Sequence, residues 1–346
     1  MTNDFVRFDK WGGFLQQKQK KVLIIRFSSF GDIIQALAAV DAVKKKFPNY
    51  QCDWLVRDDF SFFVRSVQGL SDVVVYQRKT GLLGLIRLAM DLRRKRYDII
   101  YDAHNNLRSH IVSYLLKTGR RDVTFVRRGK DRFKRWLLFK MGINKFDWPF
   151  RGAESFVRPL ESIGISLDQL GWGKLKNLPT LEKLNLPAEF WVWAPSAAWE
   201  MKRWPIEHWK ALISKMKMPV VLVGGPGDLF IEEIAKAAIY GSINLAGKIS
   251  WLETAAVIEK AKGLVSADTG VAHLADYIGV PNVILIGPTA FGFPSRKQSI
   301  SISKNLSCQP CSKDGRGRCH NDVYQRCLVD IRPEEVLEKI QIISSD

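Results

Sequence analysis

A run of four consecutive apolar residues near the start of the chain constrains its fold more than any other feature. Val22, Leu23, Ile24 and Ile25 lie between two lysines and an arginine, with no polar residue among them. An unbroken apolar run predicts a parallel strand covered on both faces, whereas a half-exposed strand alternates apolar and polar residues. A polar turn with one glycine and a helix-periodic stretch follow. The chain therefore begins with a predicted strand–turn–helix unit.

The same unit recurs along the chain. In the first half, strands are predicted at 20–27, 52–56, 73–76 and 99–102. Helical stretches lie between them, for example the one that ends near Phe47 and the one at 82–95. In the second half, strands are predicted at 190–194, 219–223, 263–266 and 282–287, and helices at 252–261 and 271–278. Alternating strands and helices predict doubly wound parallel sheets.

A length of 346 residues is about twice that of an ordinary domain, so we expect two domains. The N-terminal domain is predicted at 1–178, with 1–20 as an extra arm, and the C-terminal domain at 188–330, followed by a helix at 331–346. No apolar run reaches the roughly 18 residues of a membrane span, and no signal peptide is visible, which predicts a cytoplasmic location. The arm interleaves aromatic and basic residues and is either an interfacial membrane helix or a segment that packs on the domain.

The formal net charge of +18 predicts a polyanionic partner, which is a nucleic acid, an anionic lipid or a phosphorylated substrate. Positive charge is densest at 117–151, where aromatic and aliphatic residues interrupt it. This pattern favours an anionic membrane or a phosphorylated glycolipid. A solvated basic face over a buried apolar stretch is the structural alternative.

Ligands of open parallel sheets bind beyond the carboxyl ends of the strands. The first such place is the Ser-Ser-Phe-Gly-Asp turn at 28–32. Asp32 there either caps the following helix or acts as a general base on an attacking hydroxyl. The second is the polar segment 102–109, where Arg108 suits a phosphate or carboxylate, and where we interpret His104 as a hydrogen-bonded loop residue.

Three more places lie in the second half. Small residues at 194–198 let a ligand approach the backbone, Lys202 can reach a phosphate, and Pro205 fits the first turn of a helix. Asp228 follows a glycine turn that either binds a ribose or is only a tight connection. The segment 266–273 joins a strand to a helix, so the N–H groups of Thr269 and Gly270 are expected to face an anion.

In the same order along the chain, these segments resemble glycosyltransferase family 9, the bacterial lipopolysaccharide heptosyltransferases. The resemblance is carried by 22–32, by Lys-Arg-Trp-Pro at 202–205 and by 266–275. It continues through Gly-Val-Pro-Asn at 279–282 and Gly-Pro-Thr at 287–289, so it covers nearly the whole chain. Residues 1–20 precede the family's usual first strand, and the helix after Asp32 lacks the proline often found there.

The resemblance implies a GT-B architecture, in which two Rossmann-like domains face each other across a cleft. It also implies an inverting transfer of heptose from ADP-heptose to a Kdo/heptose–lipid A acceptor, with Asp32 as the catalytic base. The implied donor-binding residues are Ser196, Lys202, Asp228, Asp268, Thr269, Gly270 and His273. The expected acceptor-binding residues are Arg26, Ser29, Gly31, Arg108, Arg127, Arg128 and Arg132.

The resemblance also implies the partners. They are an ADP-sugar donor, a lipopolysaccharide core acceptor and the anionic inner face of the inner membrane, with no nucleic acid. Fixed cations and helix N–H groups can stabilise a leaving diphosphate without Mg²⁺, and no paired carboxylates suit a metal near the predicted site. We therefore expect no catalytic metal. The lipid-anchored acceptor and the anionic membrane imply a peripheral membrane protein.

Four of the five cysteines lie close together, and they are Cys308, Cys311, Cys319 and Cys327. In a reducing cytoplasm, such a group predicts a zinc or iron ion that staples a loop. The later spacings are not those of a standard zinc finger, so metal-free cysteines remain the alternative. Any such metal is expected to be structural and not catalytic.

Two other functions explain part of the sequence. A family 9 transferase with another nucleotide sugar fits the same motifs, because nothing in them identifies the sugar. A basic nucleic-acid-binding protein explains the charge but leaves the cleft motifs unexplained. A nicotinamide-dependent dehydrogenase is disfavoured, because no G-x-G-x-x-G follows the first strand.

Overall fold

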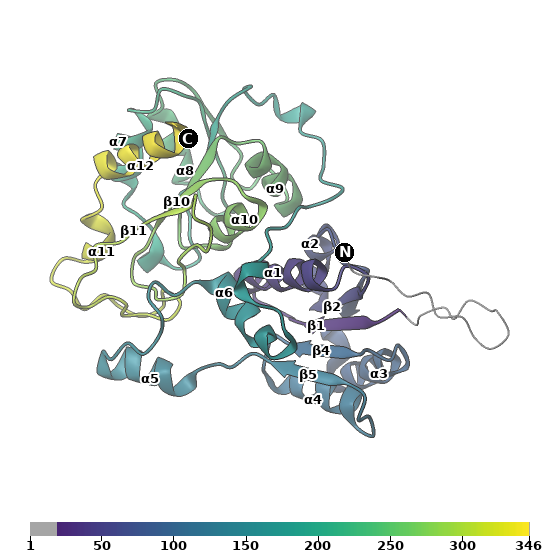
Figure 1. The fold of residues 1–346 in the computed structure, drawn as a ribbon. Coiled ribbons are helices and arrows are strands. Elements are labelled where there is room, and N and C mark those ends of the chain that lie inside the picture. Colours follow the sequence, from purple (N-terminus) through teal and green to yellow (C-terminus); the bar gives the residue numbers. More distant parts are fainter. Residues whose placement is uncertain (1–18, 346) are drawn as a thin grey trace.

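The computed structural model describes residues 19–345, which form two α/β domains (Figure 1). The N-terminal domain has a parallel sheet of five strands in the order β3-β2-β1-β4-β5. These strands are β1 (Lys21–Ile25), β2 (Gln51–Arg57), β3 (Asp72–Tyr76), β4 (Ile99–Asp102) and β5 (Thr124–Arg127). Its helices are α1 (Phe30–Lys46), α2 (Ser61–Val64), α3 (Gly81–Arg94), α4 (Leu107–Lys117), α5 (Arg132–Met141) and α6 (Gly152–Val157).

The C-terminal domain has a parallel sheet of six strands in the order β11-β10-β9-β6-β7-β8. They are β6 (Trp191–Ala194), β7 (Val220–Leu222), β8 (Ser242–Asn244), β9 (Gly263–Ala267), β10 (Asn282–Leu285) and β11 (Ile300–Ile302). Its helices are α7 (Ile206–Ile213), α8 (Ile231–Lys236), α9 (Trp251–Glu259), α10 (Gly270–Ile278), α11 (Arg326–Val329) and α12 (Pro333–Ser345). In both sheets the first strand pairs with the second on one side and the fourth on the other, so the order reverses beside β1 and beside β6.

The central strands are buried on both faces, as their unbroken apolar runs predict. Every side chain of β6 and β9 is buried, and so are four of the five in β1. The sequence analysis did not predict β5, β8 or β11, which lie at or beside the edges of the sheets and are less buried. Pro205 precedes α7 as its N-cap, one position before the predicted first turn.

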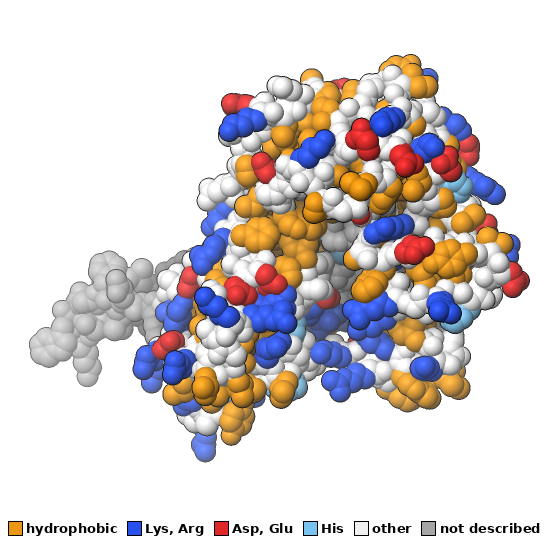
Figure 2. Space-filling view, turned by 180° about the vertical axis from the view of Figure 1, so that it is seen from behind, with side chains coloured by type: hydrophobic (Ala, Val, Ile, Leu, Met, Phe, Trp, Pro, Cys, Tyr) orange, Lys and Arg blue, Asp and Glu red, His pale blue; other side chains and the backbone are white. Residues whose placement is uncertain are grey.

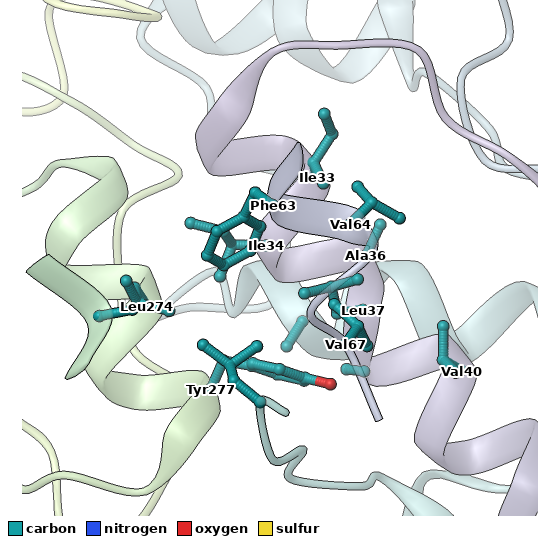
Figure 3. Packing of buried hydrophobic residues seen from close by; sticks show 14 of the residues in the cluster. Ile33, Ile34, Ala36, Leu37, Val40, Phe63, Val64, Val67, Leu274 and Tyr277 are labelled. Carbon is teal, nitrogen blue, oxygen red and sulfur yellow. The ribbon is translucent and has the colours of Figure 1, made fainter. Parts of the chain in front are cut away.

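Helices α1 and α10 join the two domains. Figure 3 shows Leu274 and Tyr277 of α10 directed at Ile34 and Leu37 of α1, within one cluster of buried side chains that draws on both domains. The Tyr277 hydroxyl also donates a 2.9 Å hydrogen bond to Asp41 Oδ2 across this interface. Each of these helices begins at a predicted site segment, so their packing brings the two segments together.

The C-terminal helix belongs with the second domain, because Val336 and Ile340 of α12 lie in the same buried cluster as Trp193 and Leu285. The predicted division at 178–188 falls in the stretch before β6 and stays a prediction. Between residues 19 and 345, no helix has the length and apolar character needed to cross a membrane. The predicted membrane arm, apart from its last two residues, lies outside the described residues.

Candidate active site

The predicted site residues lie where the order of each sheet reverses, at the carboxyl ends of the strands. Asp32 follows β1 as the third residue of α1, and Asp102 is the last residue of β4. In the other domain, Lys202 follows β6 and Asp268 follows β9. Neighbouring parallel strands end at the same edge, so each domain contributes one wall of a site.

Asp32 is the charged centre of the N-terminal wall. Its Oδ2 atom lies 2.6 Å from Arg26 Nη2 and accepts a 2.7 Å hydrogen bond from the Ser29 hydroxyl. Burial favours the neutral acid, but Arg26 and Ser29 outweigh it and hold the pKa of Asp32 below its usual range. The side chain keeps 43% of its surface exposed, so an ionised carboxylate remains accessible to a ligand.

Arg26 and Ser29 therefore hold Asp32, and we no longer assign Arg26 to the acceptor. The Arg26 guanidinium is buried, and its Nη1 donates a 2.9 Å hydrogen bond to the carbonyl oxygen of Ala103 at the end of β4. Its other terminal nitrogen is held by Asp32, and its Nε is buried without a partner among the described residues, so no exposed edge of the guanidinium faces a substrate anion. Ser29 is the N-cap residue of α1, so its bond to Asp32 joins this carboxylate to the helix start.

Asp268 is the charged centre of the C-terminal wall, and it is almost fully enclosed. Lys202 Nζ lies 2.9 Å from its Oδ2, Thr289 Oγ1 donates to the same oxygen at 2.6 Å, and His273 Nε2 lies 3.5 Å from its Oδ1. Burial raises the pKa of a carboxyl, but Lys202, His273 and Thr289 hold that of Asp268 well below its usual range. Asp268 is therefore a fixed anion that positions a lysine and a histidine.

The start of α10 lies against the start of α1. Thr269 is the N-cap residue of α10, and its hydroxyl lies 3.0 Å from the Ser266 hydroxyl. Gln35 Nε2 is 2.9 Å from His273 Nε2, and a Cβ atom added to Gly31 would lie 3.4 Å from the His273 ring. Gly31 therefore lies at the contact between the two walls, and its assignment to the acceptor stays a prediction.

Two predicted donor residues lie farther along the same wall. Ser196 is half-buried just beyond β6, whose end pairs with Ser266 of β9. Asp228 accepts a 2.7 Å hydrogen bond from the Gly225 N–H, and its other oxygen lies 3.8 Å from Arg203 Nη2. Asp228 therefore closes the glycine turn, and its contacts are those of a tight connection. Its binding to a ribose stays a prediction.

The polar segment 102–109 mostly satisfies itself. Asp102 is fully buried and accepts hydrogen bonds from the backbone of His104 and Asn105 and from the Ser109 hydroxyl. Asn106 and Ser109 form a capping box at the start of α4. The polarity that predicted a ligand here serves a helix start, as Asx and Ser residues commonly do.

The other predicted acceptor arginines differ in their contacts. Arg127 donates to Asp102 Oδ2 at 2.9 Å and to Ser113 Oγ at 3.1 Å, so it neutralises a buried acid, and its assignment to the acceptor is withdrawn. Arg128 stacks on Phe156 at 4.0 Å and is one of the cations that lower the pKa of Asp32. Arg108 and Arg132 are exposed at the starts of α4 and α5.

Arg135 is a site residue that the sequence analysis missed. Its guanidinium lies 4.3 Å from the ring of Phe291 in the other domain. Burial lowers the pKa of Arg135, and the Asp32 carboxylate is the main charge that opposes this shift. Its Nε is buried and has no partner among the described residues. The positions of Arg135, Leu138 and Phe139 on α5 recur at helical spacing, which was the available signal that one face of α5 turns inward.

A cavity of about 580 Å³ lies between the domains and reaches Thr289, the residue that donates a hydrogen bond to Asp268. Leu138, Phe139 and Trp148 line it from the N-terminal side, and Thr289 and Cys308 from the C-terminal side. Figure 2 shows the hollow between the domains with Lys and Arg side chains along it. Small-molecule sites have about this volume, so the cavity can hold one or two sugar units.

The four clustered cysteines form no disulfide. Burial is the main cause that raises the pKa of Cys327 to about 12, and Cys311, Cys308 and Cys319 raise it further. Within residues 19–345, no three His, Cys, Asp or Glu side chains are arranged to hold a metal ion. The geometry thus gives the zinc or iron hypothesis no support, and it stays a prediction.

Comparisons with known proteins agree with this arrangement. The sequence model of glycosyltransferase family 9 (heptosyltransferase) matches residues 161–319. Lipopolysaccharide heptosyltransferase 1 of Pseudomonas aeruginosa is 25% identical over 323 residues, covering 85% of this chain and 86% of that protein. The glycosyl transferase family 9 structure from Veillonella parvula has a TM-score of 0.73 at 19% identity and covers 96% of this chain and 99% of its own. Heptosyltransferase WaaC of E. coli with ADP has a TM-score of 0.66 at 22% identity, covering 93% and 99%.

The solved structures show the fold, and the sequence matches show a similarity to family 9 that extends over most of the chain. Two parallel-sheet domains facing across a cavity, with these neighbours, are a GT-B fold, as the resemblance implied. The matched relatives are covered over most of their own length. The chain is therefore similar in sequence and in fold to the heptosyltransferases of glycosyltransferase family 9, and it is a glycosyltransferase.

Proposed function

We propose that this protein transfers a heptose from ADP-heptose to the inner core of a lipopolysaccharide, with inversion at the anomeric carbon and without a catalytic metal. The names of the relatives support heptose and lipopolysaccharide, and the E. coli neighbour with ADP supports the nucleotide. The observation that carries the proposal is an accessible, ionised Asp32 opposite the cluster of Lys202, Asp268 and His273.

Asp32 is the proposed base. It takes the proton from the acceptor hydroxyl while that oxygen forms a bond to the anomeric carbon and the bond from that carbon to the diphosphate breaks. Because base and leaving group occupy opposite walls, a single displacement inverts the configuration. Arg26 keeps the Asp32 carboxylate ionised and fixed. The low pKa of Asp32 implies that proton transfer occurs late, after the bond to the leaving group has weakened.

The departing ADP gains negative charge, and the C-terminal wall supplies fixed positive charge for it. Lys202, held by Asp268, and the backbone N–H groups at the start of α10 are the proposed partners of the diphosphate. Arg135 of α5 adds a cation from the other side of the cleft. Charges that are already positioned need little rearrangement during the reaction, so these groups can replace a metal ion.

The acceptor is proposed to bind through its carboxylates and phosphates. Burial lowers the pKa of Lys130, and the charges of Arg132 and Arg26 from its own domain and of Lys313 from the other domain lower it further. Asp102, an acid that also acts on Lys130, is already neutralised by Arg127. This excess of positive charge suits Kdo carboxylates and core phosphates, with Arg108, Arg128 and Arg132 as contacts.

A peripheral position on the cytoplasmic face of the inner membrane is part of the proposal. Phe133 and Trp136 of α5 stack on each other and keep 71% and 52% of their surface exposed, with Lys134 and Lys140 beside them. The structural alternative was a basic face over a buried apolar stretch at 136–139. Of these four residues, Leu138 alone is buried. Exposed aromatic and basic side chains on one helix suit the headgroup region of an anionic membrane.

The test is a panel of nucleotide sugars with truncated lipopolysaccharide cores, read by mass spectrometry. We expect a heptose increment with ADP-heptose, an inverted anomeric configuration by NMR, and an unchanged rate in EDTA. A hexose increment from another donor would establish the alternative sugar. No increment from any donor, together with salt-sensitive binding to duplex DNA, would reject the transferase proposal in favour of nucleic-acid binding.

A further inference from the structure

The outer face of α3 and α4 exposes large apolar side chains. Five of them keep 47% to 76% of their surface exposed, and they are Leu82, Leu83, Met90, Leu107 and Tyr114. Their neighbours Leu85 and Val112 are buried in the core of the N-terminal domain. Each helix therefore has one face in the core and apolar residues on the opposite face as well.

A groove on this face joins the two helices. It encloses about 350 Å³ and is lined by Ile86, His110, Ile111, Tyr114 and Leu115. Apart from one imidazole and one phenol, its walls are aliphatic. Isolated exposed apolar residues are ordinary, but a continuous apolar patch marks contact with a partner or a membrane. We call the groove and the five exposed residues the α3–α4 face.

Positive charge surrounds the α3–α4 face. Residues 78–96 contain seven lysines and arginines and one acid, Asp91, and residues 107–121 contain four and no acid. Three of these eleven cations are paired, Arg94 with Asp91, Lys95 with Asp72 and Arg120 with Asp122. The other eight have no acidic partner within 4.0 Å among the described residues, so the face keeps an excess of positive charge. Apolar side chains that insert between headgroups, ringed by cations, complement an anionic bilayer.

The position of this face relative to α5 strengthens the match. In Figure 1, α3, α4 and α5 lie along one edge of the N-terminal domain, and Figure 2 shows apolar and basic side chains gathered along that edge. A single contact leaves a protein free to tilt on a membrane plane, whereas two separated contacts restrict its tilt.

We propose that the α3–α4 face docks on an anionic membrane as a second contact beside α5 and orients the cleft toward the lipid-anchored acceptor. The proposal rests on the membrane-bound acceptor of the proposed function. A second copy of the chain suits this face less, because a symmetric contact brings two basic rims together. A nucleic acid suits it less, because phosphates do not bind exposed leucines.

The test measures binding to vesicles separately from sugar transfer. Full-length protein is sedimented with vesicles of phosphatidylethanolamine and phosphatidylglycerol, and with phosphatidylcholine alone. Leu83→Glu and Arg87→Glu are compared with Leu229→Glu, a control in which a similarly exposed leucine of the C-terminal domain acquires the same charge. Transfer is measured on a deacylated, soluble acceptor.

We expect Leu83→Glu and Arg87→Glu each to weaken binding to anionic vesicles about fivefold to tenfold. The control variant should bind like the wild type, and all variants should transfer sugar to the soluble acceptor at the same rate. Unchanged vesicle binding in Leu83→Glu overturns the proposal, and so does equal binding of the wild type to phosphatidylcholine. A wild-type dimer that Leu83→Glu dissociates assigns the face to self-association instead. Intact vesicle binding without transfer rejects the proposed function and leaves the docking surface standing.

Discussion

The two walls of the cleft each present one aspartate beside the start of a helix, yet the two carboxylates are suited to different tasks. Asp32 retains 43% of its side-chain surface, whereas Asp268 retains 9%. Asp32 is held by Arg26 and Ser29 of the turn that follows β1, and Asp268 by three side chains from three separate segments. Exposure and the number of partners, and not the position after a strand, separate a candidate base from a structural anion.

The largest effect should come from the accessible carboxylate. Asp32→Asn removes the proton acceptor, and we expect the transfer rate to fall about 1,000-fold, as is typical of the loss of a general base. Calorimetric binding of ADP should stay near the wild-type value, which also checks folding. Asp91→Asn, at an exposed acid of α3, is the control. Full activity of Asp32→Asn would end the assignment of the base.

On the opposite wall, the expected loss is in binding. Lys202→Met removes a cation from the diphosphate and leaves Asp268 with only His273 and Thr289, so the Kd of ADP should rise about 30-fold. Lys210→Met changes a surface lysine of α7 paired with Glu207 and should leave the Kd unchanged. Equal ADP affinity in both variants would remove Lys202 from the donor site.

Arg26 tests how the first wall is tuned. In Arg26→Gln, burial still opposes the charge of Asp32 but its strongest cationic partner is gone, so the pKa of Asp32 should rise. The acid limb of the kcat/KM profile should therefore move to higher pH by about one unit. A purely structural role for Arg26 predicts a lower rate at every pH and an unmoved limb. Arg26→Lys should restore most of the wild-type profile.

The smallest effect concerns the contact that joins the walls. Burial raises the pKa of Asp41 to about 6, although the Tyr277 hydroxyl opposes the shift. The folded protein thus binds this proton more tightly than the unfolded chain, so Asp41 reduces stability as pH rises from about 4 to above 6. Asp41→Asn should raise the free energy of unfolding by about 1 kcal/mol at pH 8 and leave it unchanged at pH 4. Urea titrations at both pH values measure this, and destabilisation at both would contradict the assignment.

Local patterns were sufficient for the parts of the fold whose physical causes are local. The buried run at 22–25 predicted β1, and helical spacing after Asp32 predicted α1. Short edge strands such as β8 were missed, because all of its residues are only half-buried and its sequence lacks an apolar run. The polar segment 102–109 misled the site prediction, since a buried acid with a capping box resembles a ligand site in sequence.

The sequence by itself determined the parallel α/β architecture, the family resemblance and the residues at the strand ends, because each depends on neighbours a few positions apart. Only the tertiary structure decided what those residues contact. It placed His273 against Gln35 and Gly31, 238 and 242 positions away, turned Arg127 into the domain, and brought Arg135 over Phe291. Such contacts follow from the packing of α1 on α10 and of α5 across the cleft, and packing between distant segments leaves no periodic trace along the chain.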